Sequence, residues 1–187
     1  QWRMDWNDWN LPFLFVQLPM YLADGEKDDS YWALQREQQY IASMMIQNAG
    51  MISLADCGEY DNIHPLDKKT PGERLFQLAK NLVYDKQGTI TATAAQLFSD
   101  NGKLYVTFDH LHEKLVMQTA NGCPFEISGE DNLFYPAKAD VIHGNMLCIS
   151  NPAVKFPSAV KYAWYNFGEA VLFTESGNPV SPFFKCV

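Results

Sequence analysis

The chain has 187 residues, of which 47% are hydrophobic and 14% aromatic, and it carries a formal net charge of −8. This composition is sufficient for a packed core in one large domain or two modest ones. The acidic balance argues against a nucleic-acid backbone or an anionic membrane surface as a partner, because the long-range electrostatic field repels both. No apolar run approaches the roughly 20 residues that cross a bilayer. We therefore expect a neutral or small partner, with no nucleic acid and no membrane.

The four cysteines are widely spaced and form no Cys-x-x-Cys pair, so the sequence predicts neither a zinc ribbon nor a thioredoxin-like site. The spacing leaves their disulfide state open. His110 and His112 would lie on one face of a strand, a spacing that metal sites use, but no third ligand is close in the sequence. Surface or turn histidines are the commoner explanation. We therefore predict no metal site and no cofactor.

Apolar and aromatic residues dominate the first 19 positions. Trp2, Trp6 and Trp9 fall at near-helical spacing, which indicates the end of an amphipathic helix. The continuous apolar run 11–19 is typical of a strand buried on both faces. Gln17 is its only strongly polar member, and at the carboxyl end of a parallel strand it would point to the edge where α/β folds bind ligands. We therefore expect Gln17 to contact substrate, with a buried glutamine bonded to backbone as the alternative interpretation.

A helix is predicted after the polar loop 24–30, which offers capping side chains at its end. It runs to about Met45, and its apolar positions predict an inward-facing stripe. The stripe consists of Tyr31, Leu34, Gln38, Ile41 and Met45. The next apolar run, 51–55, predicts a second buried strand. Two strands separated by a helix predict a βαβ unit with a right-handed crossover, and hence a parallel sheet.

The loop 56–65 follows this second strand and carries the most informative residues. Asp61 lies three positions before His64. This spacing lets the carboxylate reach one ring nitrogen of the histidine and leaves the other nitrogen free, which is how a general base is oriented. A polar loop whose histidine only makes local hydrogen bonds is the alternative. We also expect Asn62, in the same loop, to contact substrate.

A second helix is signalled directly after this loop. Thr70 is predicted to cap it, Pro71 to be its first residue and Glu73 to be the reciprocal acceptor of a capping box. Apolar residues then recur at i, i+3, i+4, i+7 and i+8, which predicts one broad stripe packed on the sheet. These residues are Leu75, Leu78, Ala79, Leu82 and Val83. The helix is expected to end near Tyr84.

The pattern changes at 85–88, after which β-branched and alternating segments replace the helical periodicity. Short strands separated by turn signals are predicted beyond this point. They lie at 89–98, 103–108, 114–118, 124–128, 139–142, 146–149 and 159–165. The predicted fold is therefore an α/β domain over residues 1–85, followed by an all-β antiparallel sandwich-like domain over residues 86–187.

Several blocks of residues together carry a resemblance to a known family. They are Leu11–Leu18, Arg36–Gln39, Asp61–Pro65, Lys68, Gly72–Leu75, Val160–Trp164 and Pro179–Phe183. With these blocks the chain resembles, over nearly its whole length, the carboxyl-terminal part of sialate O-acetylesterase-like proteins, a branch of the Ser-Gly-Asn-His hydrolases. The block Asp61-Asn62-Ile63-His64-Pro65 is the most specific of them.

This resemblance implies that residues 1–85 are the carboxyl-terminal half of a Ser-Gly-Asn-His-type domain, that is, part of a three-layer parallel-sheet hydrolase domain. It implies that His64 is the catalytic base and Asp61 its orienting acid in a Ser-His-Asp acyl-transfer site. In such a site the histidine takes the serine proton during attack on the acetyl carbonyl and then returns it to the departing sugar alkoxide. The implied substrate is an O-acetylated sugar or glycan, with sialic acid, acetylated xylan and other glycans as candidates.

The family's nucleophilic serine belongs to a Gly-Gln-Ser-Asn-like motif that this sequence lacks, and no Gly-x-Ser-x-Gly elbow is present. We therefore expect the serine to lie in a missing amino-terminal segment or a second chain, and we expect these 187 residues alone to be inactive as a serine carboxylic-ester hydrolase. No targeting signal is visible, whereas the resemblance suggests a secreted, periplasmic or lysosome-like location. The alternative function is a non-catalytic carbohydrate-binding or interaction module.

Overall fold

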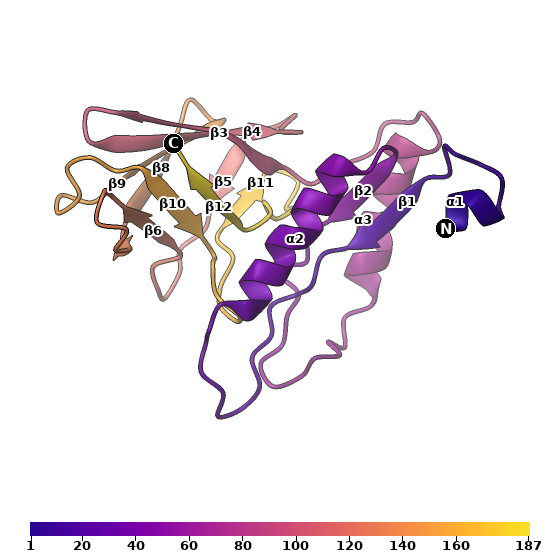
Figure 1. Cartoon of the computed structure of the whole chain (residues 1–187), viewed down its shortest axis with the longest axis horizontal. Helices are drawn as coiled ribbons and strands as arrows, with labels where there is room; N and C mark the ends of the chain where they lie inside the picture. Colours follow the sequence, from indigo (N-terminus) through magenta and orange to yellow (C-terminus); the bar gives the residue numbers. More distant parts are fainter.

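The computed structural model describes residues 1–187, and its helices are confined to the first part of the chain (Figure 1). We call residues 1–85 the α/β region and residues 86–187 the β region. The α/β region contains α1 (Trp2–Asp5), β1 (Phe13–Val16), α2 (Tyr31–Met45), β2 (Ala49–Ile52) and α3 (Lys69–Leu82). The β region contains β3 (Thr93–Asp100), β4 (Lys103–Asp109), β5 (Leu115–Met117), β6 (Phe125–Ser128), β7 (Tyr135–Pro136), β8 (Lys138–Ile142), β9 (Met146–Ser150), β10 (Ala159–Tyr162), β11 (Leu172–Thr174) and β12 (Phe183–Cys186). No helix has the combination of length and hydropathy that a bilayer-spanning helix requires.

The predicted βαβ unit is confirmed, because β1 and β2 pair in parallel with Val16 opposite Ile52. In Figure 1, α2 lies in front of this two-stranded sheet and α3 lies behind it. The approach of α3 is close. A Cβ on Gly50 would lie 2.3 Å from a methyl carbon of Leu82, so a side chain at that point of β2 would have to displace the Leu82 side chain. With two parallel strands, a complete parallel-sheet hydrolase domain is not evident, and most strands of the chain are antiparallel.

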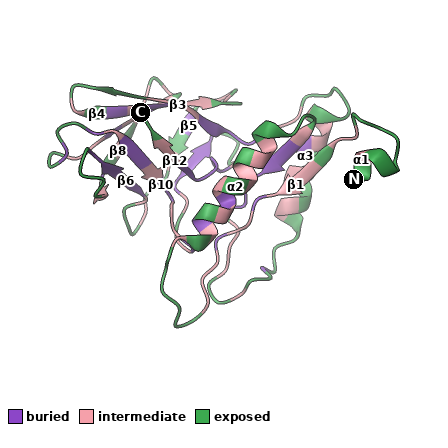
Figure 2. Ribbon diagram, viewed as in Figure 1, coloured by how far each residue is buried: buried purple, intermediate pink, exposed green.

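The predicted inward stripe of α2 is wrong, because its members face solvent (Figure 2). Tyr31 is 57% exposed, Leu34 48% and Met45 80%, while Ala33 and Arg36 on the opposite face are buried. The 3.6-residue period identifies an apolar face of a helix, but it does not identify the neighbour that covers that face. The outer surface of α2 is therefore apolar and uncovered in this chain.

The edge of the sheet beside β1 is also open. β1 pairs only with β2, so the expectation of a strand buried on both faces is wrong for Phe13, which is 37% exposed. The predicted amphipathic helix at the start of the chain is the four-residue α1, and Trp2 packs against Phe13 with ring centroids 5.2 Å apart. Trp6 and Trp9 remain exposed.

The second long helix begins one residue before the predicted cap. α3 starts at Lys69, and the carboxylate of Asp67 accepts hydrogen bonds from the backbone N–H groups of Lys69 and Thr70, each at 3.0 Å. Thr70 is therefore inside the helix and Asp67 satisfies its free amino-terminal N–H groups. Leu78 of the predicted stripe is fully buried against the sheet, as expected.

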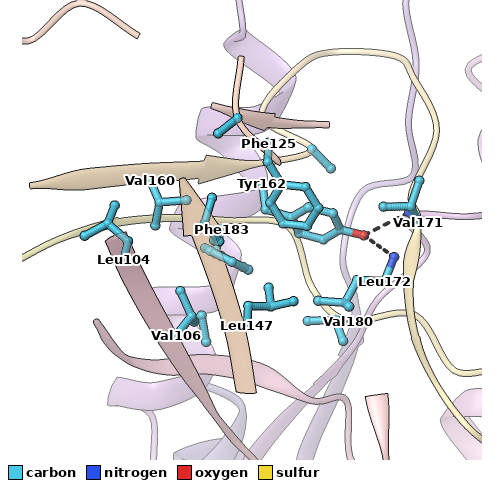
Figure 3. Packing of buried hydrophobic residues seen from close by; sticks show 14 of the residues in the cluster. Leu104, Val106, Phe125, Leu147, Val160, Tyr162, Val171, Leu172, Val180 and Phe183 are labelled. Atoms are coloured by element: carbon cyan, nitrogen blue, oxygen red, sulfur yellow. Dashed lines mark hydrogen bonds between the residues drawn. The ribbon is translucent and has the colours of Figure 1, made fainter. Parts of the chain in front are cut away.

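The β region is antiparallel, as predicted. Two four-stranded sheets have the orders β12-β10-β6-β7 and β3-β4-β9-β8, and β5 pairs with β11. The two larger sheets share one hydrophobic core, part of which Figure 3 shows. All seven predicted strands are present. The sequence analysis missed β7, β11 and β12, which are short or terminal. Tyr162 lies in the centre of the core, and its hydroxyl accepts hydrogen bonds from the N–H groups of Val171 and Leu172 at 3.1 and 2.8 Å. The division into two domains at residue 85 stays a prediction.

Candidate functional site

Two loops leave the carboxyl ends of β1 and β2 and run beside each other. The N–H of Asp61 donates to the carbonyl of Leu22 at 2.9 Å, and the N–H of Asp24 donates to the carboxylate of Asp61 at 2.9 Å. The Tyr60 hydroxyl also donates to Asp24, at 3.1 Å. These loops occupy the edge at which α/β sheets bind ligands. The candidate site is therefore assembled from residues that are far apart in the sequence.

His64 lies on the outer surface of the second loop with an exposed side chain. The side-chain oxygen of Asn62 accepts the backbone N–H of His64 at 3.0 Å, and the Asn62 amide donates to Glu59 at 2.6 Å. The other oxygen of Glu59 accepts the N–H of Leu66 at 2.7 Å. The hydrogen bonds from Leu66 and then from Asn62 lower the pKa of Glu59. Glu59 and Asn62 thus fix the backbone around His64 and leave its imidazole free.

The expected hydrogen bond between Asp61 and the His64 ring is not formed. Asp61 adopts a left-handed backbone conformation, with φ of 55°, and its carboxylate is directed to the N–H of Asp24 instead. Sequence spacing brings the two residues into one loop, but it does not fix the left-handed turn at Asp61 or the pairing of its carboxylate with the other loop. Their roles as acid and base stay predictions.

Gln17 lies directly after β1, at the predicted position, and it is fully buried. Its amide nitrogen donates to the carbonyl of Arg36 at 3.2 Å and to the hydroxyl of Ser181 at 3.0 Å. Its amide oxygen accepts the hydroxyl of Ser53 at 3.0 Å. These contacts correspond to the alternative interpretation of a buried, bonded glutamine. Contact between Gln17 and substrate stays a prediction that would require part of this network to open.

The start of the second loop is fixed to α3 by an ion pair. Arg74 donates to both carboxylate oxygens of Asp56 at 2.7 Å and to the carbonyl of Ser53 at 3.0 Å. Such bidentate pairs have the strongest geometry available to a guanidinium. Cys57 follows Asp56 directly. Burial, and then the charge of Asp56, raise the pKa of the Cys57 thiol to about 12, so this thiol is not a nucleophile at neutral pH. All four cysteines are free.

The β region holds the first loop through Asn166, which is buried. Its side-chain oxygen accepts the N–H of Trp32 at 2.8 Å, its amide donates to Asp29 at 2.9 Å, and its own N–H donates to Asp28 at 2.7 Å. The role of Asn166 could not be predicted from the sequence, because a single asparagine after a strand carries no signal of a contact more than 130 positions away.

Arg36 lies beneath the two loops, fully buried and without a carboxylate partner within ion-pair distance. Its guanidinium donates to the carbonyl of Tyr165, while its Nε and Nη1 atoms have no hydrogen-bond partner. Burial lowers the pKa of Arg36 to about 10, so the side chain is still charged at neutral pH. A positive charge therefore lies below the carboxyl ends of the parallel strands.

His110 and His112 lie in the connection between β4 and β5, outside this site. Nowhere in the structure do three or more His, Cys, Asp or Glu side chains lie together in a way that could hold a metal ion.

Among comparisons with known proteins, only the one with solved structures finds a similarity. No family model matches the chain, and no curated protein sequence matches it. Its fold is similar to the crystal structure of a carbohydrate acetylesterase from Xanthomonas citri, with a TM-score of 0.89 and 33% sequence identity. The alignment covers 99% of this chain but 43% of that protein, so the chain spans less than half the length of its structural neighbour. The comparison shows that this chain shares the fold of part of that protein.

Proposed function

We propose that this chain is part of a carbohydrate O-acetylesterase of the sialate O-acetylesterase-like type, in which His64 is the general base. The observation that carries the proposal is the match to a carbohydrate acetylesterase over 99% of the chain. A match of this extent includes the loops after β1 and β2 as well as the β region. The chain would then contribute one part of a site whose remaining groups lie elsewhere.

The position of His64 supports this role. Its backbone is held by Asn62, while its ring is free to engage a serine hydroxyl and an orienting acid on opposite nitrogens. During acylation His64 takes the serine proton and passes it to the sugar alkoxide, and during deacylation it activates water. For Asp61 to orient the ring, its carboxylate must exchange the N–H of Asp24 for the imidazole N–H. Asn62 would then act through the loop backbone more than through substrate contact.

The nucleophilic serine is proposed to come from a further polypeptide segment that pairs with the open edge of β1. Support comes from the length of the neighbour, which is more than twice that of this chain, and from the exposed apolar groups beside β1. An unpaired strand edge with exposed aromatic side chains is a template for another strand. The 187 residues alone would bind substrate weakly and turn over no ester.

The experiment is a comparison of variants in the intact polypeptide that includes any upstream coding sequence. His64→Ala should lower acetate release from acetylated xylan and from O-acetylated sialic acid by roughly 10³-fold or more, because the general base is lost. His143→Asn is the matched control, since this histidine lies in the β8–β9 turn with φ of 53°, which asparagine tolerates. Nearly unchanged turnover for His64→Ala would exclude the proposed base.

The same assay identifies the substrate and tests the alternative. The ratio of acetate release from the two substrates reports whether the sialate assignment or a plant-glycan assignment is correct. If the intact polypeptide has no serine motif upstream and a serine-directed phosphonate has no effect, the non-catalytic carbohydrate-binding module is favoured instead. The isolated 187-residue chain should show no turnover of 4-nitrophenyl acetate above that of its His64→Ala variant.

A further inference from the structure

A polar cleft lies toward the carboxyl end of α3, whereas the loop that carries His64 leads into the amino end of the same helix. The cleft has a volume of about 490 Å³, which is within the roughly 300–1,000 Å³ range of small-molecule sites. Its walls come from α3, from the linker 87–90, from the β4–β5 connection and from the end of β11 with the turn that follows it. The cleft therefore lies between the α/β region and the β region, away from the candidate catalytic loop.

The walls of this cleft are fixed by contacts within the fold. A Cβ on Gly88 would lie 2.1 Å from the carbonyl oxygen of Gln77, so the linker lies directly on α3. The side chain of Asn81 donates to the carbonyl of Gly88 at 3.3 Å and holds it there. Across the cleft, Glu113 accepts the N–H of Ser176 at 3.0 Å. The cleft is thus preformed, which reduces the entropic cost of binding.

The lining of the cleft favours a polar, hydroxyl-rich ligand and opposes an anionic one. Ile90 is the only hydrophobic residue among eleven, so an apolar ligand would gain little from burial. Gln77, Gln87 and His112 offer amide and imidazole groups that both donate and accept hydrogen bonds. Although burial would raise the pKa of Glu113, hydrogen bonds from Ser176 and Thr174 lower it, so this wall carries a negative charge at neutral pH. With a chain charge of −8, the field at the cleft opposes anions.

We propose that this cleft binds a short neutral oligosaccharide, at a site separate from the catalytic loop. The choice of a sugar as the hydroxyl-rich ligand rests on the proposed function as a carbohydrate esterase. With a polymeric substrate, the cleft would bind sugar units of the glycan without reacting with them, while the His64 loop acts on the acetylated unit. The enzyme would then favour acetylated oligosaccharides over acetylated monosaccharides.

The test is a titration of the ¹⁵N-labelled 187-residue chain with xylotriose, cellotriose and mannotriose, followed by amide NMR shifts. At least one trisaccharide should give saturable shifts at Gln87, Thr89 and His112. Gln87→Ala should weaken binding roughly fivefold or more, because a hydrogen-bonding amide is lost. Gln96→Ala is the matched control, since Gln96 is exposed on β3 outside the cleft, and it should bind as the unmodified chain does.

Three outcomes would overturn the inference. They are the absence of saturable shifts with all three sugars, unchanged affinity in Gln87→Ala, and tighter binding of N-acetylneuraminate than of the neutral sugars at the cleft. His64→Ala should leave trisaccharide binding unchanged, which separates the two proposals. If the intact polypeptide has no esterase activity but the trisaccharide still binds at the cleft, only the proposed function is wrong. If the intact polypeptide is an active esterase but no trisaccharide binds at the cleft, only this inference is wrong.

Discussion

The β region and the α/β region differ in how much apolar surface they bury. One cluster of 20 buried hydrophobic residues fills the β region, which supplies all of them except Met20 and Ala55. The α/β region has its own cluster of three, namely Ile52, Leu54 and Leu78. Its outer surfaces keep large apolar groups in water, with Trp6 75% and Met45 80% exposed. Most of the exposed large hydrophobic side chains of the chain lie in this region.

The difference indicates that the two regions depend on other parts of the protein to different degrees. The β region closes its core almost entirely with its own residues, since both four-stranded sheets contribute to one cluster to which the α/β region adds Met20 and Ala55. The α/β region presents an unpaired strand edge and a helix whose apolar stripe faces outward. The candidate site belongs to the less complete region, which agrees with the proposal that further residues complete it.

The largest expected effect comes from removing core side chains in each region. Leu147→Ala should lower the free energy of unfolding by about 2–5 kcal/mol, because it opens a cavity in the large core. Leu78→Ala, at an equally buried position, should reduce hydrogen-exchange protection in the α/β region and leave β10 and β6 protected. Equal loss of hydrogen-exchange protection in both regions after Leu78→Ala would show that the two regions do not differ in this way.

A smaller effect is expected at the contact that joins the regions. Gln17→Met preserves side-chain length but leaves the hydroxyls of Ser53 and Ser181 without their amide partner. Unsatisfied buried groups cost about 1–3 kcal/mol, so the urea midpoint should fall with an unchanged slope. Gln38→Met on the exposed face of α2 is the control and should change stability by less than about 0.5 kcal/mol. If the urea midpoint of Gln17→Met equals that of the control, the buried hydrogen bonds of Gln17 do not contribute to stability.

The outward stripe of α2 should tolerate polar substitution. Leu34→Gln and Met45→Gln should each change the free energy of unfolding by less than about 0.5 kcal/mol, because these side chains are 48% and 80% exposed. Ala33→Gln, on the buried face of the same helix, should cost about 1–3 kcal/mol through overpacking. If the stripe variants destabilise the chain as much as Ala33→Gln does, the stripe is packed inward in solution.

The smallest effect is local and depends on pH. The folded pKa of Glu59 is lower than its ordinary value of 4.5, so its contribution to loop order is complete above that value and is lost as pH falls through the folded pKa. The amide shifts of His64 and Leu66 should therefore titrate below pH 4.5, while those of the β region stay constant. In Glu59→Gln the titration should disappear. Its persistence would show that another group controls the loop.

Local patterns predicted much of the fold. Two apolar runs separated by a helical period gave the parallel β1–β2 pair, and the alternation after residue 88 gave the antiparallel strands. The pattern could not decide which face of α2 is covered, because Tyr31 to Met45 have the same period whether they face a sheet or solvent. Asp67 replaced Thr70 at the start of α3 because its carboxylate reaches two backbone N–H groups.

The candidate site was predicted less completely than the fold. The spacing placed Asp61 and His64 in one loop at the carboxyl end of β2, but the conformation of that loop depends on Asp24, Glu59 and Asn62. Asp24 belongs to the other loop, and Asn166 belongs to the β region. Such contacts between distant segments leave no periodic trace in the sequence.

The hydrogen bond between Gln17 and Ser181 has a consequence for the order of events during synthesis. The two residues are 164 positions apart, so β1 leaves the ribosome long before its hydroxyl partner has been made. Contacts of this sequence separation form late, because a long loop must close first. The contact that joins the end of β1 to the β region therefore forms only after residue 181 has been made. A nascent chain arrested before residue 181 would lack β12 and would carry a Gln17 amide that lacks one of its partners.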